Sequence, residues 1–263
     1  MNTPFPQHIV ARSFAVIDPI NREIAASHNI QERSPIASIQ KLLTALLVVE
    51  QGGLDQLVEI RPEDIACMQV RAGLRVGEYY SRRTLLACML IGSANDAALA
   101  LARDHSGNIS AFAGMMNQRA TDLGMTASLF YVPHGLPHEG QYSSARDVIH
   151  LATAVDAVPL IRDLVKQRQF DFCHSDGMAT TVHSTNKLLT MLSVCDGMKT
   201  GFTCASGYCL VASGSLGEKR RIAVVLGSQH DTVWHDAYSL LVWGLGLPES
   251  ERCEQFSPVT HIG

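Results

Sequence analysis

The sequence predicts an α/β protein of the α+β type. We expect one antiparallel sheet of about five strands, flanked by helices and interrupted by a mostly helical inserted lobe. Strand-like segments lie near both ends of the chain, whereas helical patterns dominate its middle. The order is β-β-α, a helical insertion, then β-β-β-α. This order predicts a single domain over residues 1–263, with a sheet lobe of about 1–60 plus 190–263 and a helical lobe of about 61–189.

The first elements are two strands and a helix. Residues 13–18 and 23–27 are predicted to be short strands joined by a turn at residues 18–22, which contains proline and asparagine. A helix is predicted over residues 38–50, followed by Gly52-Gly53. Because almost every position in this helix is apolar, we expect it to be buried on all sides.

The middle and the end of the chain continue this pattern. Helices are predicted over residues 82–91, 96–104, 109–123 and 144–155, strands over 207–213 and 221–227 with a turn at 214–217 between them, and a last helix over 231–243. Ser144 and Asp147 are spaced like a capping box, in which a hydroxyl precedes a carboxylate by three residues.

Composition excludes several classes of function. The 263 residues are 46% apolar and 17% charged with a net charge of −4, and no basic stripe suggests a nucleic-acid partner. The longest apolar stretch, residues 42–49, is far shorter than the ~20 residues of a membrane span, so we expect no membrane segment in this chain. Residues 1–10 contain no hydrophobic region of a signal peptide.

The seven cysteines include no C-x-x-C pair. Cys67, Cys88 and Cys195 have the mixed or apolar surroundings of buried free thiols, while Cys204 and Cys209 are close enough in sequence to suggest a pair. The cysteines and eleven histidines show no ligand-like spacing, so we expect no metal.

Three short motifs suggest chemistry: Ser38-Ile-Gln-Lys41, Ser93-Ala-Asn95 and Lys199-Thr-Gly201. Ser38 and Lys41 should lie on one helix face, one turn apart, where the free N–H groups of a helix start suit a developing oxyanion. Burial in an apolar run, with Lys199 nearby, should lower the pKa of Lys41. A neutral Lys41 could then take the proton of the Ser38 hydroxyl during attack on a carbonyl.

Each motif is weak by itself. Residues 184–187, Ser-Thr-Asn-Lys, also match S-x-x-K, although they lie in a polar stretch. Of the three motifs, Lys-Thr-Gly alone occurs a single time in the sequence. The alternative interpretation of the first motif is that Ser38 merely caps a helix while Lys41 extends to the surface.

The ordered trio is that of class A β-lactamases and penicillin-binding proteins. Over about residues 10–245, the chain resembles the low-molecular-mass penicillin-binding proteins, the serine D-alanyl-D-alanine carboxypeptidase and endopeptidase family. Further segments that carry this resemblance are Thr44-Ala-Leu, Asp96-Ala97, Met116-Asn117, Leu123-Gly124-Met125, Pro133-His-Gly-Leu136, Ser144-Ala-Arg-Asp147, Phe202-Thr203 and Gly207-Tyr208. The resemblance implies a β-lactamase/transpeptidase-like fold.

The resemblance also implies four catalytic residues. Ser38 would be the nucleophile and Lys41 the general base. Ser93 would relay a proton, and Asn95 would hold the substrate amide. No metal or organic cofactor is implied.

The implied substrate-binding residues follow one another on a strand at the edge of the sheet. Lys199, Thr200 and Gly201 would lie along the substrate backbone, with Thr203 beyond them, and the N–H groups of Phe202 and Ser38 would form the oxyanion hole. The implied partners are peptidoglycan stem peptides, with β-lactams as covalent inhibitors. The implied location is periplasmic or extracellular, with the signal peptide removed.

We therefore expect a penicillin-binding serine D,D-carboxypeptidase that cleaves terminal D-alanine through an acyl-enzyme on Ser38. A D,D-endopeptidase is the first alternative, because residues 232–235, Thr-Val-Trp-His, lack the arginine that such carboxypeptidases often carry near the start of the last helix. Carboxylate recognition would then fall to Lys199, Thr200, Thr203 or His235.

Other departures are modest. Ala94 replaces the more usual aspartate or glycine, and residues 248–263 are too short and polar for the second domain or membrane anchor of many relatives. A class A β-lactamase is a further alternative, but Glu139, the sole glutamate between the second and third motifs, has no suitably placed asparagine. A non-catalytic wall-binding scaffold is the last alternative, although Ser38, Lys41 and Lys199 are all present.

Overall fold

The structure, a computed structural model, describes residues 4–66 and 69–247. Its elements in chain order are β1 (Ser13–Asp18), β2 (Glu23–His28), the 3₁₀ turn η1 (Ala37–Gln40), α1 (Lys41–Gln51), β3 (Leu57–Glu59), β4 (Tyr79–Ser81), α2 (Arg82–Ile91), α3 (Asn95–Ser106), α4 (Ile109–Asp122), α5 (Ala145–Asp156), α6 (Pro159–Val165), β5 (Gln169–Cys173), β6 (Ala179–His183), α7 (Leu188–Met191), β7 (Cys195–Thr203), β8 (Gly207–Leu216), β9 (Lys219–Ser228) and α8 (Thr232–Leu245). None of the helices within these two ranges is long and apolar enough to cross a membrane.

The two ends of the chain form one five-stranded antiparallel sheet with the strand order β2-β1-β9-β8-β7. This confirms the predicted fold class. β9 is buried and apolar along most of its length because it lies between β1 and β8. β7 lies at the edge of the sheet, so one side of its backbone is available to a further partner.

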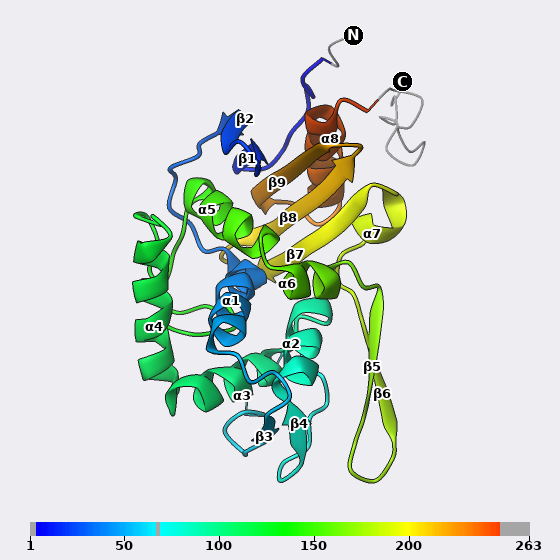
Figure 1. Ribbon diagram of the computed structural model, residues 1–263. Coiled ribbons are helices and arrows are strands. Elements are labelled where there is room, and N and C mark those ends of the chain that lie inside the picture. Colours follow the sequence, from blue (N-terminus) through cyan, green and yellow to red (C-terminus); the bar gives the residue numbers. More distant parts are fainter. Residues whose placement is uncertain (1–3, 67–68, 248–263) are drawn as a thin grey trace, which may run out of the picture.

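Helices cover both faces of the sheet (Figure 1). Side chains alternate along β9, so Ile222 and Val224 pack toward α1 and α5, whereas Ala223 and Val225 pack toward α8. Each face therefore has its own apolar core, and the first of these continues into the helical region.

Helix α1 is the centre of that helical region. Residues 41–48 are all buried, as the sequence predicts, and α1 contacts α2, α3, α4 and α5. Two small two-stranded sheets accompany the helical region: β3–β4 lies at the end of the molecule opposite the five-stranded sheet, and the hairpin β5–β6 runs alongside α2 (Figure 1). They were not predicted from the sequence.

Three expectations about local structure are wrong. The α-helix does not begin at Ser38, because η1 precedes it. The strand β8 continues through residues 214–216, where the sequence suggested a turn, and a Cβ at Gly214 would lie 2.5 Å from the Val194 carbonyl oxygen, so this glycine permits close packing. Cys204 and Cys209 are both free, since one is exposed and the other is buried on β8.

Of the capping box predicted at the start of α5, the bond made by Ser144 is present and the bond made by Asp147 is not. Ser144 Oγ accepts a hydrogen bond from the Asp147 N–H at 3.2 Å. The Asp147 carboxylate, however, accepts from the N–H of Ala127 and the hydroxyl of Ser128, both at 2.7 Å. It therefore ties α5 to a preceding loop instead of closing a capping box.

Candidate active site

Ser38 and Lys41 meet at the junction of η1 and α1. Lys41 is fully buried, so the alternative in which it extends to the surface is wrong. Its Nζ lies 2.8 Å from Ser38 Oγ, 2.7 Å from Asn95 Oδ1 and 2.7 Å from the carbonyl oxygen of His134. The first two motifs of the sequence are therefore joined through the Nζ of Lys41.

Side chains from the start of α1 hold the segment 132–135 against this junction. Successive carbonyl oxygens of residues 132, 133 and 134 accept hydrogen bonds from Gln40 Nε2, Thr44 Oγ1 and Lys41 Nζ. A Cβ at Gly135 would lie 2.1 Å from the Ala37 carbonyl oxygen, so only glycine permits this approach. The close contact fixes the His134 carbonyl beside Lys41.

The second motif begins at a residue with an unusual backbone conformation. Ser93 has φ 60°, a left-handed value that is uncommon for serine, and it connects α2 to α3. Asn95 is the first residue of α3, and its amide donates to the Gln69 carbonyl at 2.6 Å while its oxygen accepts from Lys41. Both ends of this side-chain amide are thus bonded within the protein.

The third motif lies on β7, beside the first two. Lys199 is buried, and its Nζ donates to Ser93 Oγ at 2.8 Å and to the Thr200 carbonyl at 3.0 Å. Burial lowers the pKa of Lys199 to about 7. A Cβ at Gly201 would lie 3.0 Å from the backbone nitrogen of Ser38, so the glycine lets β7 pack directly on η1.

The remaining predicted residues extend from this point along β7. Thr200 Oγ1 lies 2.6 Å from Thr185 Oγ1. Phe202 is half exposed and stacks on Tyr208, with ring centroids 4.2 Å apart. The Thr203 hydroxyl is bonded to Ser206 at 2.9 Å, within the turn between β7 and β8.

His134 also belongs to the site, although no role for it was predicted from the sequence. Its ring is buried, and its Nδ1 accepts from the Leu136 N–H at 3.1 Å, which places the ring proton of the neutral form on Nε2. Burial, together with the charge of Lys41, lowers the pKa of His134 to about 3. The sequence signals were the segment 133–136, which carries part of the family resemblance, and Gly135 within it, because a glycine can mark a close backbone approach.

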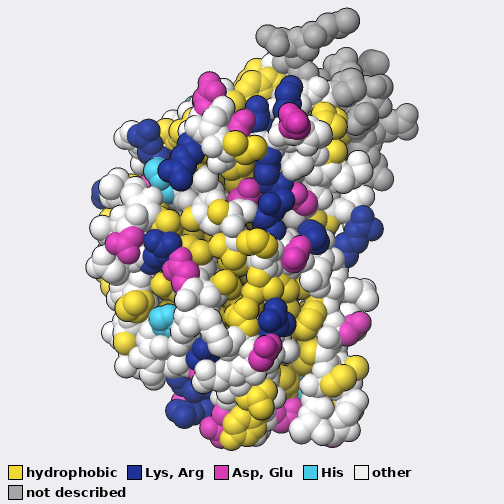
Figure 2. All heavy atoms as spheres, viewed as in Figure 1, with side chains coloured by type: hydrophobic (Ala, Val, Ile, Leu, Met, Phe, Trp, Pro, Cys, Tyr) yellow, Lys and Arg dark blue, Asp and Glu magenta, His cyan; other side chains and the backbone are white. Residues whose placement is uncertain are grey.

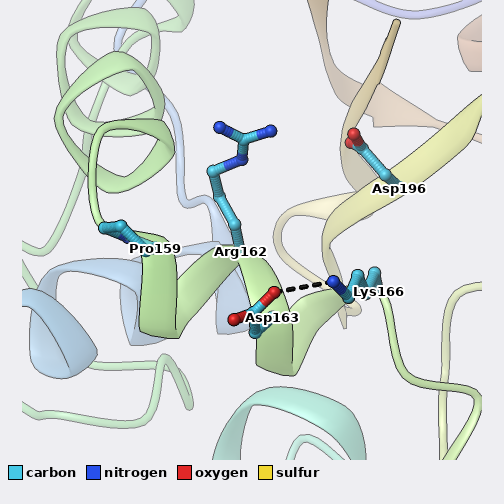
Figure 3. A pocket seen from close by; sticks show the side chains of 5 residues that line it. All are labelled: Pro159, Arg162, Asp163, Lys166 and Asp196. Carbon is cyan, nitrogen blue, oxygen red and sulfur yellow. Dashed lines mark hydrogen bonds and ion pairs between the residues drawn. The ribbon is translucent and has the colours of Figure 1, made fainter.

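A separate cavity of about 290 Å³ lies between α6 and the start of β7 (Figure 3). It is lined by Pro159, Arg162, Asp163, Lys166 and Asp196, and an ion pair of 2.6 Å joins Lys166 to Asp163. None of the nine predicted site residues lines it.

The face of the molecule in Figure 2 carries interspersed charges of both signs, as the small net charge suggests.

Comparisons with known proteins agree with this geometry. Residues 1–230 match the family model of the D-alanyl-D-alanine carboxypeptidases, peptidase family S11. The chain is 33% identical to the D-alanyl-D-alanine carboxypeptidase DacC of Escherichia coli over 91% of this chain and 62% of DacC. It is 32% identical to the D-alanyl-D-alanine endopeptidase of E. coli over 89% of this chain and 77% of that protein.

A solved structure shows the same fold. The DD-transpeptidase of Streptomyces K15 superimposes with a TM-score of 0.88 at 28% identity, covering 93% of this chain and all of the other. The chain spans about three fifths of the length of the carboxypeptidases DacC of E. coli and DacF of Bacillus subtilis. The extent of the match to the family model shows that this chain belongs to the D-alanyl-D-alanine carboxypeptidase family.

Proposed function

We propose that this protein is a serine D,D-carboxypeptidase that removes the terminal D-alanine of peptidoglycan stem peptides through an acyl-enzyme on Ser38. The observation that carries the proposal is the buried Lys41 Nζ, 2.8 Å from Ser38 Oγ. Because the assembled peptidoglycan that carries these stem peptides lies outside the cytoplasmic membrane, we propose a periplasmic or extracellular location.

The partners of Lys41 favour its role as a base. The Asn95 Oδ1 and the His134 carbonyl can only accept hydrogen bonds, so both N–H groups of a neutral Lys41 amine have acceptors there. The remaining lone pair of the neutral amine would then accept the proton of the Ser38 hydroxyl, which turns from the His134 carbonyl oxygen, 3.3 Å away, toward Nζ, 2.8 Å away. As Ser38 Oγ bonds to the peptide carbonyl carbon, its proton passes to Lys41 Nζ.

The leaving group needs a proton as the C–N bond to D-alanine breaks. Ser93 Oγ accepts from Lys199 Nζ, so its own hydroxyl proton is available to the leaving nitrogen. The proton that Lys41 took from Ser38 then passes to Ser93 Oγ, which restores the Ser93 hydroxyl and leaves Lys41 neutral. Water then attacks the acyl carbon as its proton passes to the neutral Lys41 Nζ. The bond to Ser38 Oγ breaks, Lys41 returns the proton to that oxygen, and the shortened peptide leaves as its carboxylic acid. Nothing in these steps requires a metal or organic cofactor.

Backbone N–H groups of Ser38 and Phe202 would stabilise the oxyanion. The Thr200 carbonyl accepts from Lys199 Nζ, which supports an orientation in which the backbone N–H and C=O of residue 200 point away from the neighbouring strand β8. Because every second residue of a strand has the same orientation, the N–H of Phe202 would point the same way. The close approach of Gly201 to the Ser38 nitrogen supports a shared site for both donors. Each such donor contributes about 3–4 kcal/mol to transition-state stabilisation in comparable enzymes.

The test is the intact mass of the protein after brief exposure to benzylpenicillin, with Ser38→Ala as the control. We expect an adduct of the drug's mass on the wild type alone, and release of D-alanine from a D-Ala-D-Ala stem peptide. Drug loss without a lasting adduct would indicate a β-lactamase, and neither adduct nor drug loss would indicate a scaffold without turnover. Near-normal acylation of Lys41→Arg would contradict the role of Lys41 as the base.

The endopeptidase alternative is supported by the relative of that name, which this chain covers over 77% of its length. It predicts faster cleavage of a cross-linked stem-peptide dimer than of the monomer. Comparing kcat/KM for the two substrates separates the two activities.

A further inference from the structure

The second copy of the Ser-x-x-Lys pattern, residues 184–187, lies beside the proposed substrate strand. The Thr185 N–H donates to the Ile91 carbonyl at the end of α2, at 3.2 Å. The next side chain, Asn186, is buried and donates to the Gly197 carbonyl on β7 at 3.1 Å. This segment therefore connects the helix before the second motif to the strand that carries the third.

The Thr185 side chain extends this connection to the site. Its Oγ1 lies 2.6 Å from Oγ1 of Thr200, the central residue of the third motif. Thr185 is exposed and Thr200 is half-buried, so this hydroxyl pair lies at the surface and can be reached by a ligand. Asn186 also accepts from the Leu188 N–H at 3.1 Å, which further fixes the backbone that carries Thr185.

We propose that Thr185 is a positioning residue that determines specificity for the terminal carboxylate of the substrate. This inference rests on the proposed function. The Thr185 hydroxyl donates to Thr200 Oγ1, so the single proton of Thr200 is directed to the substrate carboxylate.

The direction of the two hydrogen bonds follows from proton counting. Each threonine hydroxyl has one proton, and a carboxylate can only accept. When Thr200 donates to the carboxylate, its oxygen must accept from Thr185. Such a chain is cooperative, because each bond polarises the next, and the bond to the charged group is the stronger one.

The surrounding residues increase the importance of the uncharged Thr185–Thr200 hydroxyl pair for recognition of the carboxylate. The first turn of α8, residues 232–235, contains neither lysine nor arginine, so it supplies no guanidinium group for the carboxylate. Lys199 is engaged with Ser93 and the Thr200 carbonyl. The Thr203 hydroxyl is bonded to Ser206, which leaves Thr200 and His235 of the four candidates. Of these two, Thr200 lies on the substrate strand itself, and Thr185 would act through its hydroxyl.

The experiment compares two stem peptides that differ only in ending with D-alanine or D-alaninamide. Thr185→Val keeps the side-chain shape but removes the hydroxyl. We expect kcat/KM for the free-carboxylate peptide to fall about three- to tenfold, as for one lost hydrogen bond, mainly through KM. The ratio of kcat/KM between the two peptides should fall by the same factor.

Two further variants make the outcome specific. Thr185→Ser keeps the hydroxyl and should restore the wild-type ratio, while Thr181→Val, an exposed threonine on β6, serves as the matched control. An equal loss on both peptides without rescue by serine, or no change in Thr185→Val, would overturn the role of Thr185. A wild type that neither releases D-alanine nor forms a penicillin adduct would instead overturn the proposed function.

Discussion

Acidification should destabilise the protein through His134. The pKa of this histidine is lowered from 6.5 to about 3 in the folded state by burial and by the charge of Lys41. Between these values the unfolded chain binds a proton that the folded protein does not, so stability is lost as the pH falls from about 6.5 toward 3. The full difference corresponds to about 4–5 kcal/mol, and about 2–3 kcal/mol of it should be lost between pH 7.5 and pH 4.5.

Urea unfolding at these two pH values measures the loss. His134→Asn is the reference, because an asparagine oxygen can accept from the Leu136 N–H while the titrating ring is removed. The free energy of unfolding of the wild type should fall by about 2–3 kcal/mol more than that of the variant. Equal losses in the two proteins, or an NMR titration of the folded-state His134 ring centred near pH 6.5, would refute this reasoning.

Three further predictions concern packing. Arg220→Met should lower the free energy of unfolding by about 3–5 kcal/mol, because it removes the hydrogen-bonded partner of the buried Asp156 carboxylate and leaves it with Arg162, 4.0 Å away. Thermal unfolding that matches the wild type would contradict this. Gly135→Ala should slow acylation by penicillin at least about 100-fold, since the new Cβ would displace Ala37, and a rate within tenfold of wild type in stopped-flow measurements would argue against it. Leu86→Ala, in a fully buried position of α2, should cost about 3–5 kcal/mol, which a urea midpoint within error of wild type would disprove.

Elements with strong local patterns could be predicted from the sequence. The β1 segment, the buried α1 helix and the bounds of α2 (Arg82–Ile91) follow from apolar runs and their flanking residues. The hairpin β5–β6 could not be predicted in this way. In β5, Phe172 is the single buried residue, and the alternation of Phe170 and Phe172 is too short to distinguish a strand from a loop.

At the candidate site, residue types could be predicted more readily than contacts. The motif order indicates that Ser38, Lys41 and Lys199 converge, and the structure joins Lys41 to Ser38. The His134 carbonyl could not be foreseen as a partner of Lys41, because a backbone acceptor has no side-chain signature. The 3₁₀ geometry of η1 likewise depends on Gly135 and Gly201, which approach it from distant parts of the chain.

The position of β9 affects how the chain can fold. This strand pairs with β1 on one side and β8 on the other, and Arg221 at its start bonds to Asp18, 203 residues earlier. A chain interrupted before residue 219 would contain every motif residue, yet its β1–β2 hairpin would have no strand connecting it to β7 and β8. Such long-range closure slows folding. Reactivity toward penicillin should therefore arise only after β9 has inserted, late in the assembly of the molecule.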